Sequence, residues 1–218
     1  MSATPLVVVC AGGLGREVAA AALADEAWNL LGFADDDPAL HGRRLEGVVV
    51  LGAPEDVIAS SPDALVVLAQ ASPQESRRRE LAERLGLEDA RLATVVHPAA
   101  TLGHSVSLGP GSVVLAGVVA TAAVGIGAHV VVMAGTVLTH DDVIEDYATL
   151  ASRVALAGGV RIGPGAYVGA GAVVREGLTI GEGATVGMGA VVTRSVPAGE
   201  TWFGNPARLN GRGAPPPP

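Results

Sequence analysis

A histidine followed by two carboxylates, His140, Asp141 and Asp142, interrupts a part of the chain that has no other charged side chains. Between Arg91 and Asp141 the sequence contains no Asp, Glu, Lys or Arg. An imidazole ordinarily has a pKa near ~6.5, so it can accept a proton at neutral pH, and a nearby carboxylate can stabilise the imidazolium. The pattern makes His140 a candidate general base, with a surface histidine as the competing interpretation.

A glycine-rich turn near the start of the chain is a second candidate site. Gly12, Gly13 and Gly15 follow an apolar run and open an alanine-rich segment. If that segment is a helix, its first N–H groups and its dipole can bind an anion such as a phosphate. The spacing is not a complete G-x-G-x-x-G motif, so a tight turn without a ligand is the alternative.

Three carboxylates, Asp35, Asp36 and Asp37, end the next predicted strand. Dinucleotide-binding folds place a ribose-binding carboxylate at this position, so the N-terminal half by itself leaves a nicotinamide oxidoreductase open. Against that reading, the half is short and no second mononucleotide-binding unit follows. A solvated turn before Pro38 would explain the same residues.

The elements that position the glycine turn and these carboxylates form an α/β pattern over residues 1–94. Strands are predicted at 6–10, 30–33, 48–51 and 64–69, and helices at 15–23, 54–59 and 74–85. Short strands that alternate with helices predict a small parallel sheet with crossover helices, a Rossmann-like domain.

The elements around His140 follow a different rule, a period of six over residues 95–209. From Leu102 to Val192 every sixth residue is Val, Ile or Leu, except Ala120, and glycine often follows directly. This period is typical of a β-helix, in which each hexad forms one side of a prism and three hexads complete a coil. The aliphatic residues are predicted to point inward, and residues 210–218 are predicted to be a disordered proline-rich tail.

Histidines within the repeat raise the question of a zinc site. His104 and His140 share one phase and are two coils apart, which places them roughly 9.6 Å apart along the prism axis. One zinc ion, with ligands at about 2.1 Å, cannot bridge them. Only a site shared between subunits would remain, and nothing in the sequence supports it, so no metal is predicted.

Composition excludes several classes of partner. The formal net charge is -8, with 22 acidic and 14 basic residues, and the one basic cluster, 77–79, is predicted to lie on the solvated face of a helix. We therefore expect no nucleic-acid or anionic-membrane binding. The run from Leu92 to His140 contains too many glycines and prolines for a membrane-spanning helix. The single Cys10 and an N-terminus without a basic region make the cytoplasm the expected location.

The unbroken hexads and the closing GNPAR segment, 204–208, resemble the left-handed β-helix acyltransferases. Together with AGGLGREV (11–18) and GFADDD (32–37), they resemble the sugar acetyltransferases of the bacillosamine, perosamine and sialic-acid type over nearly the whole chain. This resemblance implies a cytoplasmic homotrimer with active sites between subunits. It also implies acetyl-CoA as co-substrate and N-acetylation, at the 4-amino group, of a nucleotide-linked deoxysugar in polysaccharide biosynthesis.

The same resemblance assigns candidate roles to individual residues. His140 is the general base, Asp141 its carboxylate partner, and the N–H of Gly158 the oxyanion donor. For acetyl-CoA the candidate contacts are Gly158, Gly159, Ala170, Asn205 and Pro206. For the nucleotide-linked sugar they are Gly12, Gly13, Leu14, Gly15, Asp35 and Asp36.

Three positions depart from the family pattern. Leu14 stands where the glycine loop usually has histidine, Met133 where asparagine is common, and Thr149 where a second histidine is common. These positions tend to line the acceptor pocket, so an altered acceptor is expected. O-acetylation of a sugar hydroxyl and a catalytically weakened nucleotide-sugar-binding protein therefore remain alternatives. Trp202 and Phe203 are candidates either to cap the last coil or to contact the cofactor.

Overall fold

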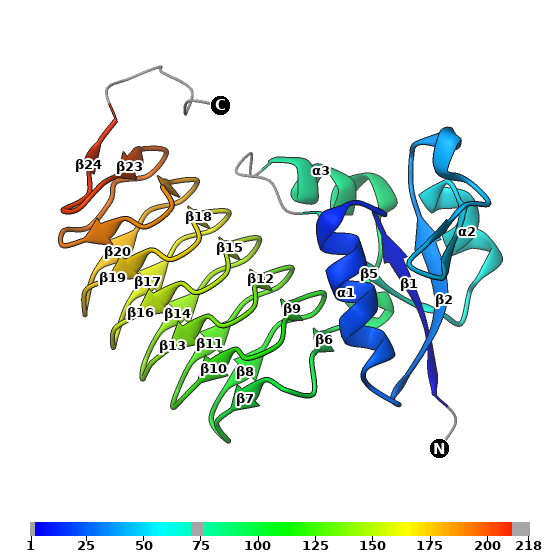
Figure 1. Cartoon of the computed structure of the whole chain (residues 1–218), viewed down its shortest axis with the longest axis horizontal. Coiled ribbons are helices and arrows are strands. Elements are labelled where there is room, and N and C mark those ends of the chain that lie inside the picture. Colours follow the sequence, from blue (N-terminus) through cyan, green and yellow to red (C-terminus); the bar gives the residue numbers. More distant parts are fainter. Residues whose placement is uncertain (1–2, 71–75, 211–218) are drawn as a thin grey trace.

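The computed structural model describes residues 3–70 and 76–210 and contains two parts side by side, an α/β sheet and a long prism (Figure 1). The sheet has the order β3-β4-β2-β1-β5, and its strands are parallel except for the β3–β4 pair. The strands are β1 (Thr4–Val9), β2 (Trp28–Ala34), β3 (Arg44–Leu45), β4 (Val48–Gly52) and β5 (Leu65–Leu68). The predicted parallel sheet is confirmed, while the short strand β3 was not predicted.

Helices cover both faces of this sheet. They are α1 (Gly13–Leu23), α2 (Pro54–Ser60) and α3 (Ser76–Leu85), with short 3-10 turns η1 (Pro38–Leu40) and η2 (Asp89–Arg91). Helix α1 shares a core with Leu6 and Val8 on one face, and α2 and α3 pack on Val7 and Val9 on the other. Helix α1 begins at Gly13, two residues earlier than predicted. The predicted start of the third helix, Gln74, lies outside the described residues.

The prism is built from short strands in three sheets, as the hexad period predicts, and the strands are parallel except for the terminal β23–β24 pair. Within each sheet, a strand pairs with the strand one coil before and one coil after it, for example Leu138 with Ala120 and Leu156. The first sheet contains β7 (Thr101–Leu102), β10 (Val119–Ala120), β13 (Val137–Leu138), β16 (Ala155–Leu156), β19 (Val173–Val174) and β22 (Val191–Val192). The second contains β8 (Ser107–Leu108), β11 (Gly125–Ile126), β14 (Val143–Ile144), β17 (Arg161–Ile162) and β20 (Thr179–Ile180).

The third sheet is the longest and borders the α/β part. Its strands are β6 (Val95–Val96), β9 (Val113–Val114), β12 (Val131–Val132), β15 (Thr149–Leu150), β18 (Tyr167–Val168), β21 (Thr185–Val186), β23 (Thr201–Phe203) and β24 (Arg208–Leu209). The β-helix thus begins with β6, at the residue 95 that the sequence predicted for the start of this part. Its last coil is shorter than the others, because Val186 pairs with Trp202 whereas Val168 pairs with Val186.

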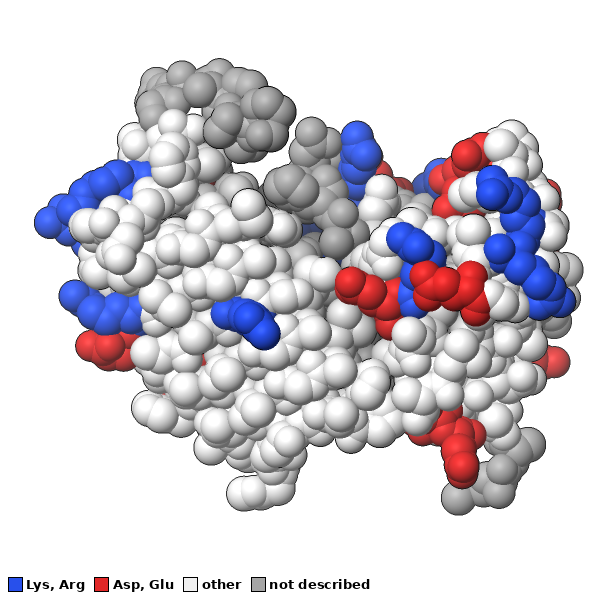
Figure 2. Space-filling view, in the orientation of Figure 1, with Lys and Arg blue, Asp and Glu red and all other residues white. Residues whose placement is uncertain are grey.

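Inward aliphatic residues form the core of the prism. From Val114 onward the predicted positions are all buried, among them Leu138, Ile144, Leu150 and Leu156. Trp202 packs against this core, which supports a capping role for it. The outer face of the β-helix is largely free of charged side chains in the view of Figure 2. No helix within residues 3–70 and 76–210 is long and apolar enough to cross a membrane.

The basic cluster at 77–79 is where the sequence prediction was wrong. Arg77 is exposed, but only 4% of Arg78 is exposed, so this run does not lie on a solvated helix face. Arg78 points from α3 into the β-helix, where its guanidinium donates to the carbonyl oxygens of Tyr147 and Ala148 and to Thr149 Oγ1. A contact between residues about seventy positions apart leaves no local signal in the sequence.

Candidate active site

The candidate base and its carboxylate lie in the corner between β13 and β14. The His140 Nδ1 and Asp141 Oδ2 atoms are 2.8 Å apart. Adjacent residues of a strand face opposite ways, but Asp141 has a left-handed backbone with a φ of 63°, which turns both side chains to the same side. Because a carboxylate only accepts hydrogen bonds, Nδ1 carries the proton and Nε2 keeps a free lone pair.

Solvent reaches both partners of this pair, since 69% of the His140 side chain and 67% of the Asp141 side chain are exposed. The pair therefore projects outward from the prism, as predicted for His140. Asp142 differs completely, because none of its surface is exposed. Its carboxylate accepts the backbone N–H groups of Thr139 and Val160, each at 2.8 Å.

Gly158 lies against the imidazole, one coil further along the same edge. A Cβ atom added at this glycine would overlap Cε1 and Nε2 of His140. Any larger residue would thus push the ring away, which is a steric reason for glycine here. The sequence prediction that His140 and Gly158 are neighbours is borne out by this geometry.

The Gly158 N–H occupies a turn position that takes no part in the bonds between coils. In the described hydrogen bonds it has no acceptor, whereas the next N–H, that of Gly159, donates to the His140 carbonyl oxygen at 2.9 Å. Pro110 and Pro164 occupy the same turn position in other corners and have no N–H at all. This N–H is therefore available to an oxygen of a bound substrate without breaking the coil.

The candidate acetyl-CoA contacts divide between two edges of the prism. Gly158 and Gly159 lie on the His140 edge, while Ala170 lies in the corner between β18 and β19. Asn205 and Pro206 are exposed and follow β23 beside β22, because the Val191 N–H donates to the Gly204 carbonyl oxygen. The structure thus does not gather all five residues at His140. The two edges border the same sheet, that of β7 to β22.

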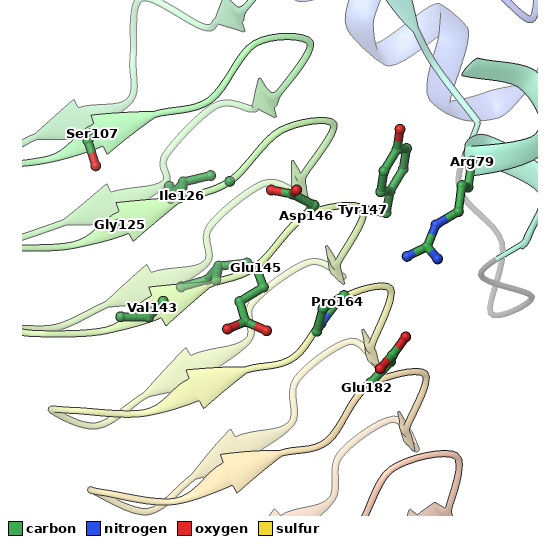
Figure 3. Close-up of a pocket in the computed structure, with 12 residues that line it drawn as sticks. Arg79, Ser107, Gly125, Ile126, Val143, Glu145, Asp146, Tyr147, Pro164 and Glu182 are labelled. Carbon is green, nitrogen blue, oxygen red and sulfur yellow. The ribbon is translucent and has the colours of Figure 1, made fainter. Parts of the chain in front are cut away.

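A groove with a volume of about 730 Å³ runs over the neighbouring sheet, that of β8 to β20. It begins at Val143, three residues after His140, and is bounded at its far edge by Tyr147 and by Arg79 of α3 (Figure 3). Glu145 and Glu182 on its wall give it acidic character, although Glu145 is paired with Arg161. This groove could not be predicted from the sequence, because Arg79 of α3 joins it from the other part of the chain.

Most of the residues predicted to bind the nucleotide-linked sugar line one pocket at the carboxyl ends of β1 and β2. Its volume is about 330 Å³. The lining residues are Cys10, Gly12, Gly13, Leu14, Asp35, Asp36, Pro54, Ala69 and Gln70. Burial, aided by the charges of Asp35 and Asp36, raises the pKa of the Cys10 thiol to about 12, so the thiol is neutral at physiological pH.

The two aspartates of this pocket already have protein partners. Asp35 accepts the N–H groups of Ala11 at 2.7 Å and Asp37 at 2.9 Å, and Asp36 forms a two-pronged ion pair with Arg84. Their carboxylates therefore shape the loops around the pocket. Gly15 does not line it: a Cβ there would overlap the Cys10 carbonyl oxygen, so this glycine permits the close approach of α1 to β1.

The positions that depart from the family pattern are occupied by contacts between the two parts of the chain. Met133 packs against the core shared by the sheet and the first coils of the prism. Thr149 Oγ1 accepts a hydrogen bond from buried Arg78, whose guanidinium also donates to the Gln70 carbonyl oxygen at 2.6 Å. Arg78 thus connects the wall of the pocket at the carboxyl ends of β1 and β2 with the coil that follows His140.

A metal centre finds no support in the part of the chain that the structure describes. Within residues 3–70 and 76–210, no group of three or more His, Cys, Asp or Glu side chains could hold a metal ion. His129 is buried against Tyr147, with ring centroids 4.9 Å apart and an interplanar angle of 12°. Burial and the nearby charge of Arg78 lower the pKa of His129, which keeps this ring neutral.

A β-helix of hexads with an exposed histidine–aspartate pair at one corner defines a class of transferase, and comparison with known proteins agrees. Residues 159–194 match the model of the bacterial transferase hexapeptide family (six repeats). No curated protein sequence matches significantly. Together the hexapeptide match and the stacked parallel sheets identify the prism as a left-handed β-helix.

Solved structures resemble the chain over nearly its full length. A variant of perosamine N-acetyltransferase from Caulobacter crescentus, in complex with CoA and GDP-perosamine, is 30% identical with a TM-score of 0.86, covering 95% of this chain and 97% of that one. The acetyltransferase domain of PglB from Neisseria gonorrhoeae FA1090, in complex with acetyl coenzyme A, is 29% identical with a TM-score of 0.84, covering 95% and 100%. WeeI from Acinetobacter baumannii AYE is 32% identical with a TM-score of 0.80, covering 94% and 99%.

The chain belongs to the hexapeptide-repeat sugar N-acetyltransferase family. It is an enzyme that uses acetyl-CoA as its acyl donor. The oxidoreductase alternative, which rested on the N-terminal half alone, is therefore set aside.

Proposed function

We propose that this enzyme transfers the acetyl group of acetyl-CoA to an amino group, the 4-amino group, of a nucleotide-linked deoxysugar, with His140 as general base. One observation carries the proposal. The His140–Asp141 pair, with 2.8 Å between Nδ1 and Oδ2, directs a free Nε2 toward the corner of Gly158. A proton acceptor and an unused N–H donor thus lie side by side on one edge.

The reaction follows from these two groups. The sugar amine attacks the thioester carbonyl carbon while Nε2 of His140 takes up its proton, and Asp141 stabilises the imidazolium that forms. The oxyanion of the tetrahedral intermediate accepts the Gly158 N–H. Collapse breaks the carbon–sulfur bond, and the imidazolium returns the proton to the CoA thiolate. The products are the sugar acetamide and CoA.

The two parts of the chain have different roles in this proposal. Residues 1–94 act as a Rossmann-like domain whose pocket at Gly12, Gly13 and Leu14 holds the nucleotide, with phosphates toward the first N–H groups of α1. Residues 95–209 bind acetyl-CoA and carry out the transfer. The carboxylates of Asp35 and Asp36 already have protein partners. The contacts to the phosphates therefore come from the backbone N–H groups at the start of α1.

We also propose that the active enzyme is a homotrimer with its sites between subunits. The outer face of the sheet of β7 to β22 presents exposed valines, Val137 and Val173, which are 37% and 41% exposed. A flat apolar face bordered by the His140 edge suits packing against a second copy of the chain. Such packing would remove His140 and Asp141 from bulk solvent.

The acceptor test uses acetyl-CoA with UDP-, GDP- and dTDP-linked 4-amino sugars, measuring CoA thiol release and product mass. Saturable release with one acetyl group added to the amine is expected for one nucleotide. A matched panel with a hydroxyl in place of the amine covers O-acetylation, which the unusual surroundings of Met133 and Thr149 favour as the second outcome. Saturable binding of a nucleotide sugar without any transfer would contradict the proposal and identify a binding protein.

A further inference from the structure

Asp142 occupies a position that is apolar in every other coil along the His140 edge. The fourth residue of each corner on this edge points into the prism, and the six residues are Val106, Val124, Asp142, Val160, Leu178 and Val196. Among the described residues, Asp142 is the one buried carboxylate. The Asp142 carboxylate lies in the coil that carries His140, at a position where the repeat predicts valine.

The carboxylate changes the hydrogen bonds of this coil. At the position just after each strand, the N–H normally donates to the next coil: Thr121 to Leu138 O at 3.1 Å, and Ala157 to Val174 O at 3.0 Å. Thr139 is the equivalent residue at the His140 corner, but its N–H donates to Asp142 Oδ2. The Thr139 hydroxyl takes its place and donates to Leu156 O at 3.1 Å.

The following corner is altered as well. In several other corners the fourth residue closes the turn on itself, as Val106 does on this edge by donating to Gly103 O at 3.0 Å and Ala166 does by donating to Gly163 O at 3.1 Å. The N–H of Val160, in the corner of Gly158, donates instead to Asp142 Oδ1 at 2.8 Å. One side chain therefore holds the residue before His140 and the residue two after Gly158.

From this geometry we infer that Asp142 is a positioning residue, which sets the distance and orientation between the His140 imidazole and the Gly158 N–H. The inference rests on the proposed roles of His140 and Gly158. The hydrogen bond to Leu156 O comes from the Thr139 hydroxyl and not from the backbone N–H. We therefore infer that the coil of His140 and the coil of Gly158 are spaced differently here from coils joined by backbone bonds alone.

Burial of the Asp142 carboxylate costs free energy, which argues that it has a role other than stabilising the fold. A carboxylate buried among valines loses its hydration, and replacing a buried charge by an apolar residue of similar volume is often neutral or stabilising. Regular corners before and after it show that the coil needs no carboxylate to form. The carboxylate thus serves the geometry of this one corner rather than the stability of the prism.

The test is Asp142→Val, which restores the apolar ladder. We expect a melting temperature equal to or above that of the wild type, together with a kcat lower by about tenfold or more, because catalysis is sensitive to misplacement of about 1 Å. The KM for acetyl-CoA should change less than kcat. A residue that only supported the fold could not give a more stable and less active enzyme.

A second variant and a control keep the test decisive if Asp142→Val fails to fold. Asp142→Asn keeps an acceptor for Val160 but places an NH2 group against the Thr139 N–H, and should also lower kcat. Ser105→Ala removes a corner hydrogen bond of the same edge two coils away, from Ala123 N–H to Ser105 Oγ at 2.8 Å, and should leave kcat unchanged. Wild-type kcat in whichever Asp142 variant folds overturns the inference.

Two further readouts separate this inference from the proposed function. If His140→Asn keeps wild-type turnover, the proposed base is wrong; if His140→Asn is inactive while Asp142→Val is fully active, only the inference about Asp142 fails. A crystal structure of Asp142→Val does not depend on turnover. It should place the Thr139 N–H on Leu156 O and shift His140 relative to Gly158, and an unshifted pair would overturn the inference.

Discussion

Two successive corners of one coil, 139–142 and 145–148, share a backbone geometry and differ in what covers them. Asp141 and Tyr147 occupy equivalent positions, with φ values of 63° and 61°. The first corner presents His140 and Asp141 to solvent, while the second packs under α3, with Tyr147 between His129 and the guanidinium of Arg79. The solenoid supplies corners of similar backbone geometry, and the neighbouring side chains leave one of them exposed and pack the other against α3.

The comparison predicts that changes at the first corner affect activity and changes at the second affect stability. Apart from loss of His140 itself, Gly158→Ala should have the largest effect, because its methyl group would overlap Cε1 and Nε2 of His140. We expect kcat to fall about a hundredfold with little change in melting temperature. Steady-state kinetics and thermal denaturation measure the two quantities.

A control for Gly158→Ala exists one coil beyond Gly159. Gly177 has a φ of 67° and open space around it, so Gly177→Asn adds a side chain without reaching His140. It should cost roughly 1 kcal/mol of stability at most and leave kcat within a few-fold of the wild type. Equal losses of kcat in both variants would refute the steric account of Gly158.

At the second corner, Arg78→Met should chiefly destabilise the protein. Burial lowers the pKa of Arg78 to about 10, so the guanidinium is still charged at neutral pH, and it joins α3 and Gln70 to Tyr147 and Thr149. Removing these donors leaves buried acceptors unpaired, which should cost about 2–3 kcal/mol. For a chain of this size that is roughly 5–10 °C in melting temperature by calorimetry.

Arg77→Met is the matched control, because Arg77 is the exposed neighbour in the same helix. Its effect on stability should be within about 0.5 kcal/mol. A similar melting temperature for Arg78→Met and the wild type would show that the buried arginine does not hold the two parts together.

The smallest expected effect is on how the stability contributed by Asp142 changes with pH. Burial raises the pKa of Asp142 from 3.8 to about 6, against the opposing influence of its two backbone N–H partners and of His140. A raised carboxyl pKa means that the folded state favours the protonated form, so this stabilising contribution is present below about pH 4 and is lost as pH rises through about 6. The charged groups that influence Asp142 are His140 and Asp141.

We therefore expect the melting temperature of Asp142→Val, relative to the wild type, to rise by a few degrees between pH 4 and pH 7. Thermal scans of both proteins in the same buffers cancel the contributions of the other carboxylates. A difference that stays constant with pH would mean that Asp142 is ionised throughout this range.

The β-helix and the corner of His140 could be predicted because the repeat fixes direction as well as position. Once Leu138 and Ile144 are known to point inward, His140 must lie outside, and Gly158 must lie one coil beyond it. The same rule held a signal for Asp142, since Val124 and Val160 stand at its position in the neighbouring coils.

The docking of α3 could not be predicted, for the opposite reason. Arg78 and Tyr147 belong to parts of the chain with different periods, and no local pattern records which arginine of the cluster 77–79 turns inward. The strands and the glycine loop of residues 1–94 were predictable from their apolar runs. The partners of Asp35 and Asp36 were not, because Ala11 and Arg84 are brought to them only by the folded sheet.

The most direct test of the central claim is the turnover of His140→Asn beside the wild type, with acetyl-CoA and the best acceptor of the nucleotide-sugar panel. Loss of the general base should lower kcat by about 10²–10⁴-fold, with the melting temperature unchanged because the side chain is exposed. Transfer by the variant at the wild-type rate would contradict the account, since the corner at 139–142 would then not be where the chemistry occurs.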